Sequence, residues 1–525
     1  RRVVAWSVNH KFFVVAATVV IFATSVVAFG RVQQQFFPVS ERTELFFQMR
    51  LPQGTAITAS LETAKRAEAM LKGDRDVKTF TTYVGQGSPR FWLGLNPQLP
   101  DESFAEIVIQ AKDLEARERL KARLEREVAA GALSEARVRV DRFNFGPPVG
   151  FPVQFRVIGP EPAMVRDTAV KVREIMRANP NARDPHLDWN EQSPSVRLVV
   201  DQDRARALGL NVQDVAQTLQ TLLSGVTVTT VRDRTEKVDI VARAVPAERV
   251  DLGRIGDLTI VARGGVPVPL AQVARIEFIQ EDPILWRRNR DLTMTVRADV
   301  ADGVQPPVVS AQVQAALKDL IASLPAGMRI QQGGAVEESE KANASIFVLF
   351  PIMLLGMLTV LMIQLQSFSR LALVFSTAPL GLIGASFALN LLNAPFGFVA
   401  LLGLIALAGM IMRNTVILVQ QIDENQEAGL TLYHAIIEAT VHRSRPVVLT
   451  AMAAILAMVP LARSLFWGPM AITIAGGLFA ATLLTILFLP ALYAVWFRVR
   501  RPEAKAEVPE TEAALPAPPL PIAAE

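Results

Sequence analysis

The apolar residues of this chain gather into six long stretches, one near the start and five in the last third. A helix needs roughly 20 apolar residues to cross the hydrocarbon core of a bilayer, which is about 30 Å thick. The stretches of this length lie near residues 11–30, 346–365, 371–391, 397–421, 446–463 and 471–496. Mean hydropathy is +0.30, in keeping with the pattern. The sequence therefore predicts an integral membrane protein with six transmembrane helices.

Basic residues flank these stretches mainly on one side. Cytoplasmic loops carry the excess of Lys and Arg in membrane proteins. The basic flanks are Arg1, Arg2, Lys11, Arg370, Arg443, Arg445, Arg498, Arg500 and Arg501. On the other side, residues 392–396 contain no Lys or Arg, and the loop after Pro460 contains only Arg463. This asymmetry predicts a cytoplasmic N-terminus and places the long polar segment 31–345 outside the cytoplasm.

The polar segment has the pattern of folded α+β units. Its first part alternates apolar residues with the periods of strand, helix, strand, strand, helix and strand over residues 44–143, the ferredoxin-like βαβ order. A second such unit begins at 151–178 and resumes at 291–333, and an α+β block is inserted over 196–285. The Pro-, Ala- and Glu-rich tail after Pro502 is predicted to be disordered.

Arg413 and Asn414 interrupt the apolar stretch of residues 403–419. A charge inside a membrane is costly, and it usually faces a partner or a wet cavity, so the pair indicates an ion-coupled transporter. The alternative is that the guanidinium reaches the nearby cytoplasmic surface. Arg443 and Thr450 lie seven residues apart on one face of the fifth stretch. Taken singly, Arg443 fits a topological anchor, and Thr450 fits a hydroxyl bonded to its own helix backbone.

A Gly- and Pro-rich loop at residues 82–100 carries Tyr83, Phe91 and Trp92. Long loops inside compact units are often functional, and aromatic side chains on an adaptable loop suit an apolar ligand. Packing against the neighbouring subdomain explains the same residues equally well. The scattered methionines have no ligand spacing, and we assign them to core packing.

Several chemistries have no motif in this sequence. It contains no phosphate-binding G-x-x-x-x-G-K-[ST] loop, no H-E-x-x-H, no G-x-S-x-G, no cysteine and only four histidines. The net charge of +4 is too small to indicate a nucleic-acid partner. We expect no enzyme activity, no cofactor and no metal site, and the energy source is expected to be a partner or an ion gradient.

Five segments together resemble the C-terminal half of a resistance-nodulation-division (RND) efflux transporter of the hydrophobe/amphiphile, or multidrug, branch. They are GPPVGFPVQFRVIG (146–159), DQDRARALGLNVQDV (201–215), APLGLIGA (378–385), GLIALAGMIMRNTVILV (403–419) and RSRPVVLTAMAAILAMVPLA (443–462). They run through nearly the whole chain in the family's order. The chain also begins with Arg1 rather than Met, which favours a fragment of a longer protein.

The resemblance implies an α-helical bundle of six transmembrane helices and periplasmic porter subdomains of ferredoxin-like type with an inserted docking block. We expect the first transmembrane helix at 1–32 and a porter subdomain at 33–147. The second porter subdomain is expected at 148–195 and 289–340, around the docking subdomain at 196–288. Five transmembrane helices at 341–500 and a cytoplasmic tail at 501–525 complete the expected order.

The resemblance also implies roles for single residues. Arg413 falls where the family usually has a lysine of its proton relay, with Asn414 beside it, and Arg443 and Thr450 fall on the relay's arginine and threonine. Arginine keeps the charge but, unlike lysine, does not readily lose its proton. The aspartates that take up the proton belong to the other half, and none of the predicted spans has an acidic residue in its interior. Tyr83, Phe91 and Trp92 would face the substrate.

The function implied is drug/proton antiport at the bacterial inner membrane by a homotrimer. An adaptor protein in the periplasm and an outer-membrane channel would be its partners, with amphiphilic compounds as substrates. Two alternatives remain open: heavy-metal efflux within the same superfamily, and a sensor or accessory protein built on a single half-repeat.

Overall fold

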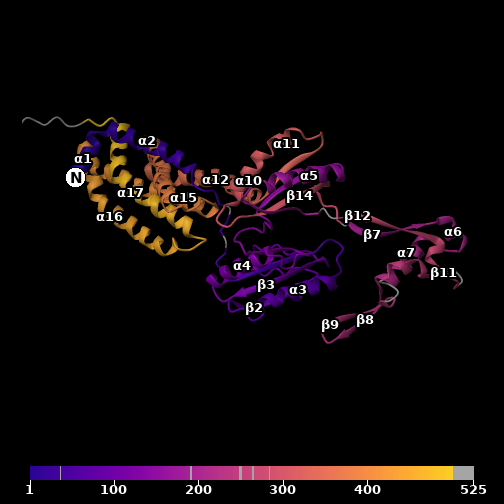
Figure 1. The fold of residues 1–525 in the computed structure, drawn as a ribbon. Helices are drawn as coiled ribbons and strands as arrows, with labels where there is room; N and C mark the ends of the chain where they lie inside the picture. Colours follow the sequence, from indigo (N-terminus) through magenta and orange to yellow (C-terminus); the bar gives the residue numbers. More distant parts are fainter. Residues whose placement is uncertain are drawn as a thin grey trace, which may run out of the picture.

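The computed structural model describes residues 1–500 except 36, 39, 190, 191, 247–250, 263, 264 and 283. The expected cytoplasmic tail lies outside the described residues. Three parts follow one another along the molecule in Figure 1: a helical bundle, two α/β units and an inserted block that projects farthest from the bundle. We call the α/β units the first unit (residues 44–142) and the second unit (residues 153–187 and 287–334).

Within the described part of the chain, six helical segments are long and apolar enough to cross a membrane. They are α2 (Lys11–Phe29), α12 (Ala335–Leu365), the α13–α14 segment (Phe368–Leu391), α15 (Phe398–Glu427), α16 (Leu432–Leu461) and α17 (Gly468–Trp496). A short helix, α1 (Arg2–Asn9), precedes them. Several of these helices extend beyond the apolar stretches; α12, for example, begins eleven residues before its predicted start and follows the last strand of the second unit directly.

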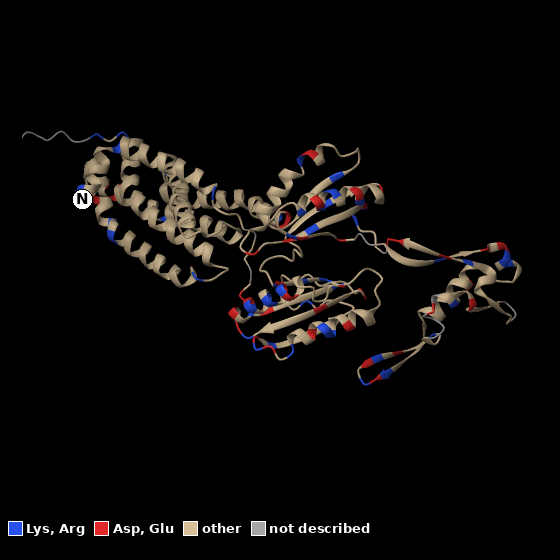
Figure 2. Cartoon of the chain, viewed as in Figure 1, with Lys and Arg blue, Asp and Glu red and all other residues tan. Residues whose placement is uncertain are grey.

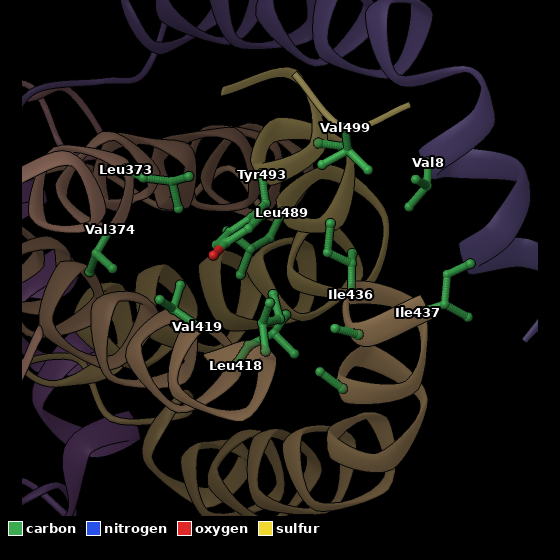
Figure 3. Packing of buried hydrophobic residues seen from close by; sticks show 14 of the residues in the cluster. Val8, Leu373, Val374, Leu418, Val419, Ile436, Ile437, Leu489, Tyr493 and Val499 are labelled. Carbon is green, nitrogen blue, oxygen red and sulfur yellow. The ribbon is translucent and has the colours of Figure 1, made fainter. Parts of the chain in front are cut away.

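The core of the bundle is built where α13 (Phe368–Thr377), α15, α16 and α17 meet near α1. Figure 3 shows Leu418 and Val419 of α15, Ile436 of α16, and Leu489 and Tyr493 of α17 in one cluster. Elsewhere the packing is closer still. A Cβ atom on Gly384 of α14 (Gly381–Leu391) would lie 2.1 Å from the backbone oxygen of Gly476 in α17. Such small residues let helix backbones approach one another in a membrane.

Charged side chains are sparse along the bundle and frequent in the other two parts (Figure 2). At the end of the bundle that carries α1, Lys11 donates to the carbonyl oxygens of Ala494 and Val499. Arg1 forms an ion pair with Glu438 at the same end. Lys11 therefore caps the end of α17, and Arg1 ties the start of the chain to the first turns of α16.

The first unit has the predicted ferredoxin-like order. Its antiparallel sheet runs β2-β3-β1-β4, and helices follow β1 and β3 in the chain. The elements are β1 (Glu44–Arg50), α3 (Ile57–Leu71), β2 (Val77–Val84), β3 (Phe104–Ala111), α4 (Leu114–Ala129) and β4 (Arg137–Arg142). Alternate residues of β1, Leu45, Phe47 and Met49, are buried against the helices, as the period-2 pattern requires.

The second unit repeats this order as β6-β14-β5-β15, with β13 added beside β14. Its elements are β5 (Val153–Gly159), α5 (Pro162–Arg177), β6 (Ala182–Leu187), β13 (Arg287–Arg288), β14 (Asp291–Val300), α10 (Pro306–Ala316), α11 (Lys318–Ala322) and β15 (Arg329–Gly334). The sequence pattern did not predict β6. This strand contains Pro185, and its pairing with β14 shifts register where Asp184 adopts a φ of 45°.

The inserted block begins and ends with a pair of antiparallel strands, β7 (Ser193–Val200) and β12 (Ala274–Glu281). Between them lie α6 (Gln202–Ala207), α7 (Val212–Leu223), η1 (Leu252–Asp257), β10 (Thr259–Val261), β11 (Pro267–Pro269) and α9 (Leu270–Val273), which share a small core. A hairpin of β8 (Val226–Asp233) and β9 (Glu236–Ala242) projects from this core, and every one of its residues is exposed.

Candidate functional site

Arg413 and Asn414 are neighbours in the chain, but their side chains lie in different surroundings. Asn414 is buried at 5% exposure, whereas Arg413 is exposed. Arg413 therefore lies on an exposed face of α15. A guanidinium in this position is available to a partner outside these residues.

The other two predicted relay residues lie on α16. Arg443 is half-buried, and its Nε atom is buried without a hydrogen-bond partner among the described residues. Thr450 is exposed, and its hydroxyl donates to the carbonyl oxygens of Pro446 and Val447 at 2.9 and 3.1 Å. Thr450 thus makes the local backbone bonds typical of a membrane threonine.

Helices α15 and α16 pack together close to these positions. Ile411, two residues before Arg413, and Ala451, next to Thr450, belong to one buried cluster. Within the described part of the chain, however, no hydrogen bond or ion pair joins any two of Arg413, Asn414, Arg443 and Thr450. The two helices pack together through Ile411 and Ala451, whereas Arg413 and Thr450 lie on exposed faces of their helices.

Helix α15 continues beyond the predicted end of its span, and this extension carries Asp423, Glu424 and Glu427. Asp423 lies in α15, beyond the predicted end of that span at 421, and pairs with Arg370 of α13 at 2.8 Å. Its carboxylate is 22% exposed. Asp423 therefore lies outside the predicted span 397–421, which contains no acidic residue.

The loop between β2 and β3 folds back over the open face of the first sheet. Arg50 of β1 holds it through Asp101 at 2.9 Å and Gln98 at 3.1 Å. The buried Glu106 accepts the Ser88 backbone N–H at 3.0 Å. Fixed in this way, the loop forms one wall of the space between the two units.

The three predicted aromatic residues take different positions around this loop. Tyr83 is half-buried in β2, opposite Glu106. Phe91 is 44% exposed and makes an edge contact with Phe143.

Trp92 donates to the Asn144 carbonyl at 3.0 Å. The Trp92 ring contacts Phe145, which in turn contacts Phe466 in the loop between α16 and α17. Phe91 is therefore the most available of the three.

Three hollows lie between the first and second units. Nearest the bundle is one of about 100 Å³, lined by Phe46, Leu95, Phe143 and Phe145 together with Arg139 and Ala335. A second, of about 290 Å³, lies beside Arg50, Arg137 and His186. A third, of about 360 Å³, is lined by Arg139, Phe151 and Asp299. Tyr83, Phe91 and Trp92 do not line any of these three hollows.

Ion pairs, rather than shared apolar residues, connect the two units. Arg139 of β4 binds Asp299 of β14 through two bonds of 2.7 and 2.8 Å. Four further ion pairs between the units are longer: Arg142–Asp302, Lys121–Asp302, Arg137–Asp184 and Arg183–Glu125. The buried cores of the units have no residue in common. Polar interfaces of this kind allow two domains to move relative to each other.

Burial shifts the pKa values of the groups at this interface. It raises the pKa of the Asp299 carboxyl to about 6; Arg139 opposes the shift, and Asp141 adds to it. His186, 3% exposed, has its pKa lowered to about 2 by burial and by Arg297 and Arg137. Its Nδ1–H donates to the Asp184 carbonyl at 2.7 Å, and its Nε2 accepts from Arg297 at 3.0 Å. The His186 imidazole is therefore uncharged and accepts a hydrogen bond beside these arginines.

Within the described residues, no three His, Asp or Glu side chains are placed to hold a metal ion together. Residues 1–497 match the family model described as the AcrB/AcrD/AcrF family.

Relatives of two kinds align with the chain. It is 27% identical to the nickel and cobalt resistance protein CnrA of Cupriavidus metallidurans over 94% of this chain and 47% of that protein. It is 23% identical to the multidrug resistance protein MdtC of Serratia proteamaculans over 95% of this chain and 48% of that protein. The chain thus spans about half the length of the curated relatives it matches.

The fold is shared with a crystal structure of a heavy metal efflux pump, with a TM-score of 0.75 and 24% identity. That likeness covers 94% of this chain and 51% of that one.

Proposed function

Because this chain belongs to the AcrB/AcrD/AcrF family of RND permeases, we propose that it forms the C-terminal half of a proton-driven efflux transporter. The exported compounds are amphiphilic or hydrophobic. The observation that carries this proposal is Arg413, an exposed cation in the middle of a membrane-length helix. A charge in such a place needs a partner, and acidic residues of the other half would supply it.

Coupling uses Arg413, Asn414, Arg443 and Thr450. Protonation of an acidic partner releases the Arg413 guanidinium, which then takes another acceptor while it stays charged, as arginine does. The buried Nε–H group of Arg443, on the neighbouring helix α16, donates no hydrogen bond within the described residues. It can therefore exchange acidic partners in the same way. Thr450 supplies a hydroxyl that can turn from its own backbone to a new acceptor.

The substrate path runs through the space between the two units. Phe46, Leu95, Phe143 and Phe145 give the hollow nearest the bundle an apolar wall, and Phe91 lies exposed beside Phe143. Phe91 and Trp92 on the loop, and Tyr83 at the end of β2 where the loop begins, contact the substrate outside these hollows. Aromatic walls with few fixed polar groups suit ligands of varied shape.

The assembly is a homotrimer in the bacterial inner membrane, with the two units and the inserted block in the periplasm. Support comes from the β8–β9 hairpin, whose apolar side chains are about half exposed among the described residues: Val226, Val228, Val231, Val238, Ile240 and Val241. Exposed apolar surface of this kind marks protein contacts. A periplasmic adaptor and an outer-membrane channel complete the path beyond the inserted block.

Heavy-metal export is the second candidate, because relatives named for nickel and cobalt resistance align as fully as those named for multidrug resistance. One experiment separates the candidates. Cells lacking their own pumps receive the complete natural protein or its Arg413→Ala variant, and resistance is measured to cationic dyes, neutral detergents, nickel and cobalt. Amphiphile resistance that depends on Arg413 supports the first proposal, and metal resistance alone supports the second. Equal resistance of the two proteins to every compound would favour an accessory role.

A further inference from the structure

The loop between α16 and α17 touches a segment beside the first unit that is far away in the chain. The Leu465 backbone N–H donates to Glu41 Oε1 at 2.7 Å, and the Ser464 hydroxyl donates to the same oxygen at 3.4 Å. Next to this bond, the centroids of the Phe145 and Phe466 rings lie 4.7 Å apart. In Figure 1 the loop lies at the end of the bundle that faces the α/β units. We call Glu41, Phe145, Leu465 and Phe466 the joint.

Glu41 and Phe145 flank the first unit in the chain, and both flanks are fixed to it. The Ser40 backbone N–H donates to the Phe143 carbonyl at 3.0 Å, so the two flanks are bonded to each other. Arg117 of α4, 4% exposed, donates to the Ser40 carbonyl at 2.8 Å. A buried cation of the first unit thus holds the flank that carries Glu41. We therefore expect Glu41 and Phe145 to move together with the first unit.

Phe145 also contacts the loop between β2 and β3. The centroids of the Trp92 and Phe145 rings lie 5.7 Å apart. A Cβ atom on Gly94 would lie 2.6 Å from the Asn144 carbonyl oxygen, so the loop backbone lies directly against the segment that carries Phe145. Gly94 and Phe145 both line the hollow nearest the bundle. A displacement of Phe145 therefore changes the position of this loop and the shape of this hollow.

On the membrane side, the joint follows directly after α16, the helix that carries Arg443 and Thr450. This helix ends at Leu461, about three turns after Thr450. No proline or glycine lies between Thr450 and Val459, so nothing in this stretch favours a kink. Rigid helices carry displacements between distant sites. A tilt or slide of α16 near Thr450 therefore moves the loop that bears Leu465.

We propose that the joint passes movement of α16 to the first unit, and that Glu41 and Phe145 are positioning residues for export. The joint stays closed while the bundle moves, so the first unit follows α16. The bond to the Glu41 carboxylate is directional, and the ring pair adds apolar contact, so together they fix the loop in place. The inference rests on the proposed function and deepens it by naming a contact through which the coupling residues act on the first unit.

Hydrogen exchange tests the joint without any transport. The complete natural protein in lipid nanodiscs is compared with its Arg413→Ala variant, which removes the charge proposed to drive the movement. The exchange rate of peptides covering residues 91–98 is expected to change about fivefold. In a protein that already carries Glu41→Ala and Phe145→Ala, the same substitution is expected to change this rate by less than about twofold. An equal change in both proteins, or no change in either, would overturn the proposal.

Export of Nile red, a neutral amphiphilic dye, by proteoliposomes with an imposed proton gradient gives the functional measurement. Glu41→Ala is expected to lower kcat about tenfold and to leave KM within about twofold of the parent, because Glu41 positions the unit without touching the dye. Glu41→Gln keeps an oxygen that accepts the Leu465 N–H, and kcat is expected to stay within about twofold of the parent. A loss of kcat in Glu41→Gln as large as in Glu41→Ala would contradict a positioning role for this bond.

Glu44→Ala is the matched control, because the Glu44 carboxylate pairs with Arg42 at 2.7 Å on the same side of the first unit and takes no part in the joint. Its kcat is expected to equal that of the parent, and a loss as large as that of Glu41→Ala would overturn the proposal. The two measurements also separate the joint from the proposed function. If the parent exports no dye, proton-driven export of amphiphiles fails, while hydrogen exchange still decides whether α16 and the first unit are coupled through the joint.

Discussion

Arg370 of α13 and Asp423 of α15 form an ion pair of 2.8 Å that joins two membrane helices at the basic end of the bundle. Tyr493 of α17, 2% exposed, lies close to both charged groups. Three helices thus meet at one charge pair, inside a cluster that is otherwise apolar. This arrangement fixes the relative positions of their ends.

Removing one partner of this pair should destabilise the bundle more than removing both. Asp423→Ala leaves the partly buried Arg370 without a carboxylate, and an uncompensated charge costs more than a lost pair. We expect each single alanine variant to lower the apparent melting temperature by roughly 5 °C. The double variant should fall by less than the sum of the two. Thermal stability of the purified protein, followed by size-exclusion chromatography after heating, measures this, and additive losses would show that the pair is not coupled.

Arg413→Ala should abolish resistance while membrane insertion and protein amount stay unchanged. Its guanidinium makes no hydrogen bond or ion pair within the described residues, so the loss should be functional rather than structural. Arg413→Lys should keep at least a substantial part of the resistance if a charge that changes partners is all that coupling needs. Minimum inhibitory concentrations, with immunoblots of the membrane fraction, give both readings. Undiminished resistance of the alanine variant would remove Arg413 from the coupling role.

His186 should make the second unit less stable in acid. Its pKa is about 2 in the folded state and about 6.5 in an unfolded chain, so the unfolded state binds the extra proton. The His186 contribution is therefore fully present above pH 6.5 and falls by about 1.4 kcal/mol for each pH unit below it. Hydrogen exchange of β6 and β14 peptides, compared between the parent and His186→Gln at each pH, isolates this slope. If hydrogen-exchange protection in His186→Gln falls with decreasing pH as steeply as in the parent, His186 is not the source of the acid sensitivity.

Gly384→Ala should disrupt the contact between α14 and α17. The new methyl group would lie 2.1 Å from the Gly476 carbonyl oxygen and 2.7 Å from the Ala480 Cβ, so the helices must move apart. Overpacking of this kind costs about 1–3 kcal/mol. Gly356→Ala in α12 is the control, because nothing lies within 4 Å of its added Cβ. Heat resistance of the folded protein should fall for the first variant only; equal behaviour would mean that this close approach is dispensable.

Strong local periodicity allowed much of the fold to be predicted. The apolar stretches and the βαβ pattern of the first unit depend on residues close in the chain, and the structure has these elements in the predicted order. β6 was missed because Ala182–Leu187 has charges and a proline instead of alternation. It becomes a strand only through pairing with β14, which is distant in sequence.

The candidate site was less predictable, for a related reason. Arg139 and Asp299 are 160 residues apart, and neither stands out from the many charged residues around it. Arg413 stood out because a membrane span makes any charge conspicuous, but its exposure depends on which neighbours cover α15. Phe91 and Trp92 were visible as aromatic residues on a loop, whereas their contacts with Phe143 and Phe145 needed the tertiary structure.

The order of strands has a consequence for how the protein is made on the ribosome. The first unit is continuous in the chain, so it can close its core as soon as β4 has emerged. β5 and β6 must wait for β14 and β15, which follow only after the whole inserted block. During that interval the apolar side of β5 and α5 has no sheet to complete it, and such surfaces attract chaperones or aggregate. The nascent second unit is therefore the step at which we expect biogenesis to be most vulnerable.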